Sequence, residues 1–220
     1  MIESGMDMRS SSPDFEALPS AAARSGRTRK STRRRAAIMR AAITIMNQKS
    51  YALATMGEIA ASLDLRDGAL YYYFESKQAL AYACHVHSLG VFERILRDVD
   101  AHEESGFKKV EGFIRGLIVD GDRNGPQLYF GDYSYLNADE RRHVKEWSDQ
   151  LIAMLEGFLD QGLRDGSVVE CEPKVVVQLV LGMLIWLAKW IPSIEDMTVE
   201  RLLDAIGIAS LNGLAARRTA

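Results

Sequence analysis

Residues 55–80 decide the fold of this 220-residue chain, and they read TMGEIAASLDLRDGALYYYFESKQAL. Thr55 and Glu58 stand at the spacing of a capping box, in which each side chain satisfies a free backbone N–H at a helix start. Asp64 follows in a tight turn at residues 63–66, because aspartate tolerates a left-handed backbone. A second short helix is expected over residues 67–74. Two short helices joined by such a turn have the spacing of a helix-turn-helix.

The second of these helices has an outer face that suits the major groove of DNA. Leu70 and Phe74 are expected to face the core, and Gly68 allows a close approach of the backbone. A helix whose outer side chains are small, polar or planar can enter the groove. Those side chains are Arg66, Asp67, Ala69, Tyr71, Tyr72 and Tyr73. The tyrosine triplet could instead be half-buried packing, but the motif around it favours DNA contact.

Residues 32–92 resemble the DNA-binding domain of the TetR family of bacterial regulators. The resemblance rests on residues 35–38, which open a helix, on residues 55–60, and on the string GALYYYFESKQAL at 68–80. It implies phosphate contacts by Thr55, Met56, Tyr71, Tyr73 and Lys77, and base contacts by Arg66, Asp67, Gly68, Ala69 and Tyr72. Arg66 stands where the family often has Ser or Thr, so the usual cap of that helix is missing.

Charge is divided unevenly along the chain, although its sum is only −3. Residues 1–80 hold 12 basic and 8 acidic side chains, a net of +4, and the remainder holds 15 and 22, a net of −7. The basic cluster includes Arg33 and Arg34, for which we expect contact with DNA phosphates; a solvated charged tail is the alternative. The asymmetry favours a basic DNA-binding module attached to an acidic body.

Helical periodicity dominates the rest of the chain, which predicts an all-α protein. We expect a disordered basic tail at 1–31, a DNA-binding domain at 32–92 with its helix-turn-helix at 55–74, and a helical effector-binding and dimerisation domain at 93–220. The first helix is expected at 32–48. Further helices are expected at 106–123, 127–136, 139–165, 173–191 and 198–216, separated by Pro and Gly.

A homodimer is expected from the segment between Val175 and Ile191, which is apolar on nearly every side. Such a helix must be buried on every side, and one side can be covered only by a partner. TetR-like proteins dimerise through their last two long helices. The residues expected at the interface are Val176, Val180, Leu184, Leu203 and Ile206.

Aromatic side chains in the body predict a cavity for an apolar or aromatic ligand, although an ordinary core is the alternative for each of them. The candidates are Phe113, Tyr129, Tyr133, Trp147, Phe158 and Trp186. Gln127, Asp132, Asn137 and Gln150 are polar candidates for orienting a ligand. The stretch from Trp186 to Trp190 resembles regulators of fatty-acid or acyl-CoA metabolism, which makes a lipid-related ligand one option. The effector itself is unknown.

Export, membrane insertion and catalysis are not expected. Arg40 and Asn47 interrupt the apolar run after the basic cluster, and the run 175–191 is shorter than the ~20 residues of a spanning helix, so we expect a cytoplasmic protein. Cys84 and Cys171 are expected to be reduced thiols. His85 and His87 diverge on a helix and cannot share a metal. No enzyme activity, cofactor or metal is expected.

The function expected from these features is that of a dimeric repressor of transcription. It would bind a pseudo-palindromic operator in double-stranded DNA, with half-sites about 34–36 Å apart or a multiple of this. A ligand would then release it by favouring a different conformation of the body. The alternative is an effector-free structural DNA-binding protein, which would show little sequence specificity and no ligand-dependent release.

Overall fold

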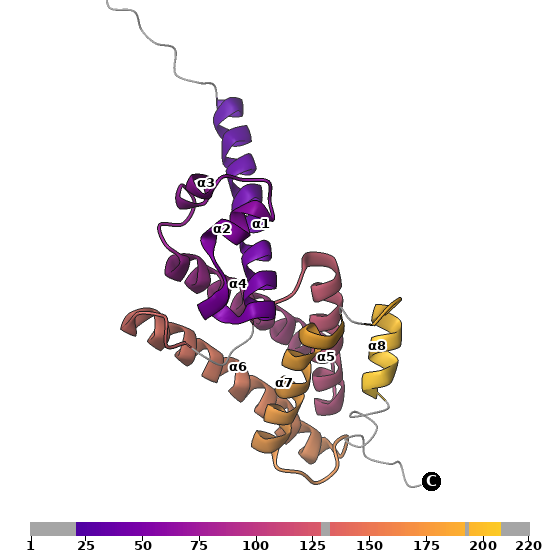
Figure 1. Ribbon diagram of the computed structural model, residues 1–220. Coiled ribbons are helices and arrows are strands. Elements are labelled where there is room, and N and C mark those ends of the chain that lie inside the picture. Colours follow the sequence, from indigo (N-terminus) through magenta and orange to yellow (C-terminus); the bar gives the residue numbers. More distant parts are fainter. Residues whose placement is uncertain (1–20, 129–132, 192–193, 208–220) are drawn as a thin grey trace, which may run out of the picture. The chain divides into compact units, whose positions relative to one another are not determined.

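The computed structural model describes residues 21–128, 133–191 and 194–207, and these ranges contain eight helices (Figure 1). The helices are α1 (Ala21–Leu53), α2 (Met56–Ala61), α3 (Asp67–Tyr71), α4 (Lys77–His102), α5 (Gly106–Asn124), α6 (Ala138–Asp165), α7 (Pro173–Trp190) and α8 (Val199–Ile206). The predicted all-α class is confirmed. The chain divides into two compact units, residues 1–35 and residues 36–220.

Helix α1 starts earlier than expected, at Ala21 rather than near residue 32. Residues 21–31, which the sequence predicted as part of a disordered tail, are therefore helical. Alanine, arginine and lysine are among the best helix formers, and no proline follows Pro19 in this region. The expected disorder of residues 1–20 lies outside the described residues. At its other end, α1 is interrupted at Ser50 (φ 76°), close to the expected end at residue 48.

One hydrophobic core holds together the segment from residue 36 to the first turns of α4. Ile38 and Ile43 of α1, Ile59 of α2, and Leu70 at the end of α3 are completely buried, as is Leu80 of α4. The buried positions predicted for the helix-turn-helix are thus confirmed. Because α4 continues into the body, the same helix contributes to both cores of the unit.

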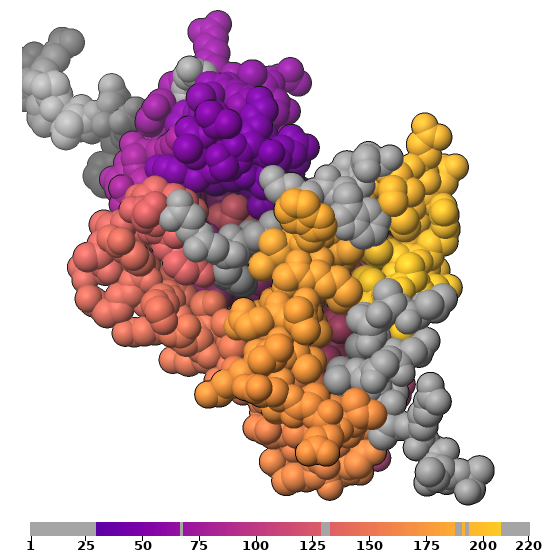
Figure 2. All heavy atoms as spheres, turned by 60° about the horizontal axis from the view of Figure 1, so that its bottom comes forward, coloured from indigo at the N-terminus to yellow at the C-terminus, as the bar shows by residue number. Residues whose placement is uncertain are grey.

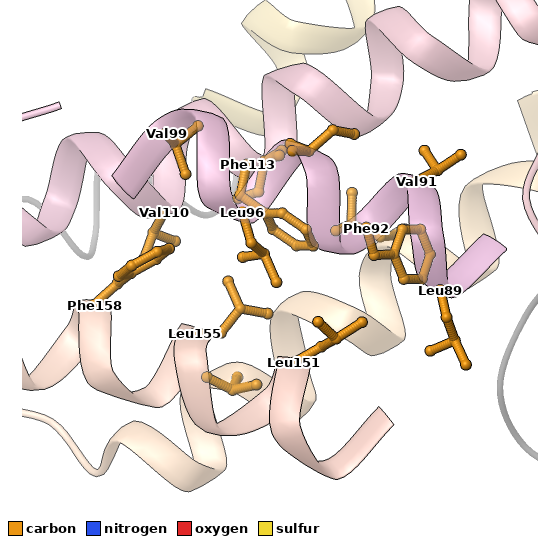
Figure 3. Packing of buried hydrophobic residues seen from close by; sticks show 14 of the residues in the cluster. Leu89, Val91, Phe92, Leu96, Val99, Val110, Phe113, Leu151, Leu155 and Phe158 are labelled. Carbon is orange, nitrogen blue, oxygen red and sulfur yellow. The ribbon is translucent and has the colours of Figure 1, made fainter. Parts of the chain in front are cut away.

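The core of the body is formed mainly by α4, α5 and α6, whose apolar side chains interdigitate (Figure 3). Phe92 of α4 meets Phe113 of α5 edge to face, with ring centroids 6.3 Å apart. Glycines let α5 and α6 approach closely: a Cβ built on Gly106 would lie 2.1 Å from the backbone nitrogen of Gly162. These contacts hold α4, α5 and α6 together, and the other helices of the body pack against them.

The prediction of a helix at residues 127–136 is wrong, because Gln127, Leu128 and residues 133–136 are not helical. The backbone of this loop is bound by side chains instead of by a helical ladder. Asn47 Nδ2 donates to the carbonyl of Gln127 at 2.8 Å, and the N–H of Leu128 donates to Ser88 Oγ at 2.8 Å. Asn137 then begins α6 with a complete capping box.

Helices α7 and α8 complete the described part of the body. Val177, Leu184 and Leu187 of α7 and Leu202 and Ile206 of α8 are buried in the body core. Figure 2 shows α7, in orange, lying open to solvent along one face of the unit. Among the described residues, no helix is both long and apolar enough to cross a lipid bilayer. Residues 208–216 of the last predicted helix lie outside the described ranges.

Candidate DNA-binding surface, ligand cavity and dimer face

The turn between α2 and α3 is formed as the sequence predicts. Asp64 adopts a left-handed conformation with φ 54°. The N–H of Leu65 donates to the carbonyl of Ala60 at 2.9 Å, which satisfies a carbonyl at the end of α2. This bond returns the chain across the end of α2 and fixes the direction in which α3 leaves the turn.

The start of α2 carries half of the predicted capping box. Thr55 Oγ1 accepts a hydrogen bond from the N–H of Glu58 at 3.1 Å. The carboxylate of Glu58 forms an ion pair with Lys49 of α1, which ties α2 to the first helix. Of the two phosphate contacts expected here, Thr55 is exposed, whereas the side chain of Met56 is buried. The side chain of Met56 is therefore not available for a phosphate contact.

Helix α3 ends at Tyr71, earlier than the expected residue 74, and the exposed surface at its end is made largely of tyrosine. Tyr72 is 81% exposed and Tyr71 52% exposed, whereas Tyr73 is half-buried and meets Tyr72 edge to face. Arg66 is the N-cap residue and makes no capping bond with its side chain, as the sequence predicts. Packing within the unit does not explain why the large rings of Tyr71 and Tyr72 are exposed. Their exposure supports the interpretation that they belong to a binding surface.

The small residues of α3 leave its first turn open. Gly68 is exposed, and a Cβ built on it would have no atom within 4 Å. Ala69 is half-buried, and the side chain of Asp67 lies outside the described residues. A nucleic-acid backbone or base edge could thus approach α3 closely at this end.

Lys77 has a structural role that the sequence did not reveal. Its ammonium donates to the carbonyls of Tyr51 and Ala54, each at 2.9 Å, and lies 4.3 Å from the centre of the Tyr51 ring. These bonds hold the end of α1 against the start of α4. Because an ammonium has three N–H donors, a phosphate contact of the kind expected for Lys77 would use the third.

Arg33 and Arg34 lie exposed on the part of α1 that belongs to the N-terminal unit. Arg35, the next residue, is exposed as well. Three adjacent guanidinium groups on a helix form a dense positive charge, which is the electrostatic feature that phosphate backbones attract.

A cavity of about 390 Å³ lies in the unit of residues 36–220. Its wall combines Thr44, Asn47 and Gln48 of α1 with residues of α5, α7, α8 and the loop after α5. The apolar lining residues are Phe92, Leu117, Ile118, Pro126, Leu181, Leu184, Ile185, Leu187, Ile191, Met197, Val199 and Leu202. The volume falls within the range of small-molecule sites, about 300–1,000 Å³. The helix that supports the helix-turn-helix is therefore also a wall of this cavity.

None of the described aromatic residues expected to bind a ligand lines this cavity. Phe113 and Phe158 are buried in the body core, and Trp186 is 63% exposed on α7. Tyr133 packs against His85, and Trp147 donates from its indole N–H to Glu93 at 3.1 Å. Tyr129 lies outside the described residues. Apolar periodicity identifies inward positions, but it does not distinguish a filled core from the wall of an empty space.

Of the four polar candidates, Gln127 lines the cavity and is buried. Asn137 caps α6 and Gln150 is exposed, while Asp132 lies outside the described ranges. Gln127 Nε2 donates to Asp120 Oδ2 at 3.1 Å, and Arg94 donates to Asp120 Oδ1 at 2.6 Å. This network between α4, α5 and the following loop was not expected from the sequence, where Arg94 lies 26 residues before Asp120.

An aromatic stack connects the middle of α4 to the end of α1. His85 Nε2 is 2.8 Å from the hydroxyl of Tyr135, and the Tyr135 ring stacks on Tyr51 at 3.7 Å between centroids. His85 is completely buried, and this burial lowers its pKa from 6.5 to about 4. The imidazole is therefore neutral in the folded protein at neutral pH.

The exposed apolar face of α7 differs from the expected dimer interface. Val175, Leu179 and Trp186 are 50%, 67% and 63% exposed and lie on one stripe of the helix. Of the residues expected at the interface, Leu184 and Ile206 are buried in the body core, and Val176, Val180 and Leu203 are half-buried. The sequence does not show which side of α7 faces the core, so it could not identify this exposed stripe.

Comparison with known families identifies both halves of the chain. Residues 38–84 match the model of bacterial regulatory proteins of the tetR family, and residues 109–214 match that of the Tetracyclin repressor-like C-terminal domain. The chain belongs to the TetR family. It is thus a transcriptional regulator with a DNA-binding helix-turn-helix, and dimers that bind operator DNA are typical of TetR proteins.

Solved structures show the same fold at low sequence identity. The crystal structure of AibR in complex with isovaleryl coenzyme A and operator DNA has a TM-score of 0.65 and 22% identity, over 80% of this chain and 97% of that chain. The ketosteroid regulator KstR2 of Mycobacterium tuberculosis has a TM-score of 0.66 and 14% identity, over 84% and 96%. The regulator PfmR from Thermus thermophilus has 0.62 and 20%, over 80% and 97%. No curated protein matches the chain in sequence.

Proposed function

We propose that this TetR-family protein is a repressor that leaves its operator when a small apolar ligand occupies the cavity beside α1. The observation that carries the proposal is the shared wall: Thr44, Asn47 and Gln48 line the cavity and belong to the helix that packs under α2 and α3. A ligand that fits only one arrangement of this wall shifts the population toward that arrangement. Such a regulator acts in the cytoplasm, on the chromosome.

In this proposal the chain is divided as the sequence indicates. Residues 1–31 form a basic N-terminal segment, residues 32–92 the DNA-binding domain, and residues 93–220 the effector-binding and dimerisation domain. Arg33 and Arg34 bind phosphates, and their exposure on α1 supports this role. The exposed stripe of α7, formed by Val175, Leu179 and Trp186, supports dimerisation through this helix.

The DNA-contacting residues are proposed in two classes. Thr55, Tyr71, Tyr73, Lys77 and the backbone of Met56 hold phosphates, and such contacts position the protein without reading sequence. Arg66, Asp67, Gly68, Ala69 and Tyr72 face the bases, where hydrogen bonds distinguish one base pair from another. The exposure of Tyr72 and Arg66 supports their assignment to this surface.

The two classes make separable predictions for DNA binding. Replacing Tyr71 by Phe removes one phosphate donor, so affinity for operator and unrelated DNA should fall by the same factor. Replacing Arg66 by Ala should cost about 1–3 kcal/mol on the operator alone and relax the preference at one base position. Fluorescence anisotropy with operator variants measures both effects. A position-specific change in Tyr71→Phe would contradict its assignment to phosphate.

The ligand is proposed to be apolar, since twelve of the cavity-lining residues are apolar. AibR was crystallised with isovaleryl coenzyme A, and a lipid or acyl-CoA-related ligand is one option for this chain too. Native mass spectrometry of protein purified from its source cells identifies a co-purified molecule. Adding this molecule to the stripped protein should weaken operator binding about 5- to 150-fold, the usual range of allosteric coupling. An unchanged operator affinity would contradict ligand-dependent release.

A further inference from the structure

The start of α3 carries a single side chain that can donate a hydrogen bond to a base. In helix-turn-helix proteins, the first residues of the second helix contact base edges in the major groove. Here these residues are Arg66, which is the N-cap residue, and then Asp67, Gly68 and Ala69. Glycine and alanine have no polar side-chain atoms, and an aspartate carboxylate only accepts hydrogen bonds. Arg66 is therefore the one donor among these four side chains.

The guanidinium of Arg66 is not engaged by the described part of the protein. Arg66 is exposed and makes no capping bond at the start of α3. Among the residues whose side chains the structure describes, none forms an ion pair or a hydrogen bond with this guanidinium. Arg94 and Arg97 of α4, in contrast, each pair with a carboxylate. The N–H donors of Arg66 are thus available to a partner outside the unit.

The backbone of Arg66, unlike its side chain, is held in place. The carbonyl of Arg66 accepts a hydrogen bond from the N–H of Ala69 at 2.9 Å, and the N–H of Leu65 donates to the carbonyl of Ala60 at the same distance. Leu70 is completely buried and anchors the other end of α3 in the core. The Arg66 side chain therefore extends from a fixed point at the start of α3.

Lys77 is the other basic residue of the segment 55–77, and its bonds exclude it from the same role. Its ammonium donates to the carbonyls of Tyr51 and Ala54, each at 2.9 Å, which leaves one of its three N–H donors. Guanine, adenine and thymine each present at least one acceptor in the major groove, so a single donor cannot distinguish them. Arg66 can offer two donors side by side.

Guanine is the base whose major-groove edge matches two adjacent donors. It presents the acceptors N7 and O6, whereas adenine combines an acceptor with a donor, thymine has one acceptor beside a methyl group, and cytosine has a donor. The planar fork of a guanidinium can donate to both guanine acceptors at once. The hydroxyl of Tyr72 both donates and accepts, so it selects less sharply. Gly68, with no atom within 4 Å of an added Cβ, leaves room for the close approach.

We propose that Arg66 reads a guanine in each operator half-site by donating to its N7 and O6. This proposal rests on the sequence-specific DNA binding proposed above, and it names the base and the atoms that are contacted. Because Arg66 stands where the TetR family often has Ser or Thr, this guanine should distinguish the operator of this chain from those of many relatives.

The test begins with DNA that the full-length protein selects from a library of random duplexes. We expect an enriched palindrome with a G·C pair at the same place in both halves. Replacing this guanine by 7-deazaguanine, which lacks N7, should weaken binding at least about tenfold in fluorescence anisotropy, because a hydrogen bond to a charged group is lost. Inosine is the matched control: it keeps N7 and O6 and lacks only the minor-groove amino group, so it should bind within about twofold of guanine.

Two protein variants assign the effect to one side chain. Arg66→Ala should bind the guanine and 7-deazaguanine duplexes within about twofold of each other. Arg115→Ala removes the same charge from an exposed position on α5, and its sensitivity to 7-deazaguanine should match that of the wild type. A sensitivity that survives in Arg66→Ala would overturn the proposal. So would a loss of affinity in Arg66→Ala that is equal on selected and unrelated DNA, since this indicates a phosphate contact.

The same experiment separates this inference from the proposed function. If the selection enriches no sequence, sequence-specific binding is refuted, and the guanine contact with it. If a palindrome is enriched but lacks the paired guanine, or binds equally well with 7-deazaguanine, the sequence-specific regulator stands and only the role of Arg66 is overturned.

Discussion

Replacing Leu179 by Lys should dissociate the dimer without unfolding the protomer. Leu179 is 67% exposed on α7, so about two thirds of its side chain remains to be buried by a partner. Complete burial of a leucine stabilises by about 1.5–3 kcal/mol, which leaves about 1–2 kcal/mol per protomer. A two-fold interface counts the residue twice, giving about 2–4 kcal/mol per dimer and a rise in the dimer dissociation constant of roughly 30- to 700-fold.

Sedimentation equilibrium over a wide range of protein concentrations measures this constant. Leu53→Lys is the matched control, because Leu53 is 70% exposed but lies at the end of α1. We expect Leu53→Lys to dimerise like the wild type, and both variants to keep the helical circular dichroism of the parent. A Leu179→Lys protein that dimerises as tightly as the control would refute the assignment of the dimer face to this stripe.

Two further predictions concern the stability of the body. Gly106→Ala should lower the free energy of unfolding in urea by about 1–3 kcal/mol, because the new Cβ would meet backbone atoms of α6. Gly121→Ala is the control: it has open space around it and should stabilise α5 by about 0.5–1 kcal/mol. Equal effects of the two substitutions would refute the close approach of α5 and α6. Burial lowers the pKa of His85 to about 4, so the folded state binds fewer protons than the unfolded state between about pH 4 and 6.5, and stability should fall as pH falls through this window, by about 3 kcal/mol at most. His85→Phe should remove this pH dependence while His87→Gln, at an exposed position, should keep it; a wild-type slope in His85→Phe would contradict the burial argument.

The DNA-binding half was predictable because its structure is encoded locally. The turn at Asp64, the cap at Thr55 and the buried Leu70 each follow from a few neighbouring residues. The role of Lys77 was not predictable, since its partners Tyr51 and Ala54 lie more than twenty residues away. Its bonds depend on how α1 and α4 meet.

The cavity and the dimer face were beyond the reach of sequence patterns for a related reason. Both are defined by which side of a helix its neighbours leave uncovered. Trp186 and Phe113 are both large aromatic residues in apolar helices, yet one is exposed and the other buried. Gln127 was one of several polar candidates, and only the bond to Asp120 shows which of its amide atoms remains free.

DNase I footprinting on the DNA upstream of its own gene tests whether this TetR-family protein is a sequence-specific operator-binding dimer. The wild type should protect one short pseudo-palindrome, with half-sites about 34–36 Å apart or a multiple of this, and Leu179→Lys should lose the footprint. Diffuse protection without a palindrome, equal to that on unrelated DNA, would contradict the claim and favour an effector-free structural DNA-binding protein.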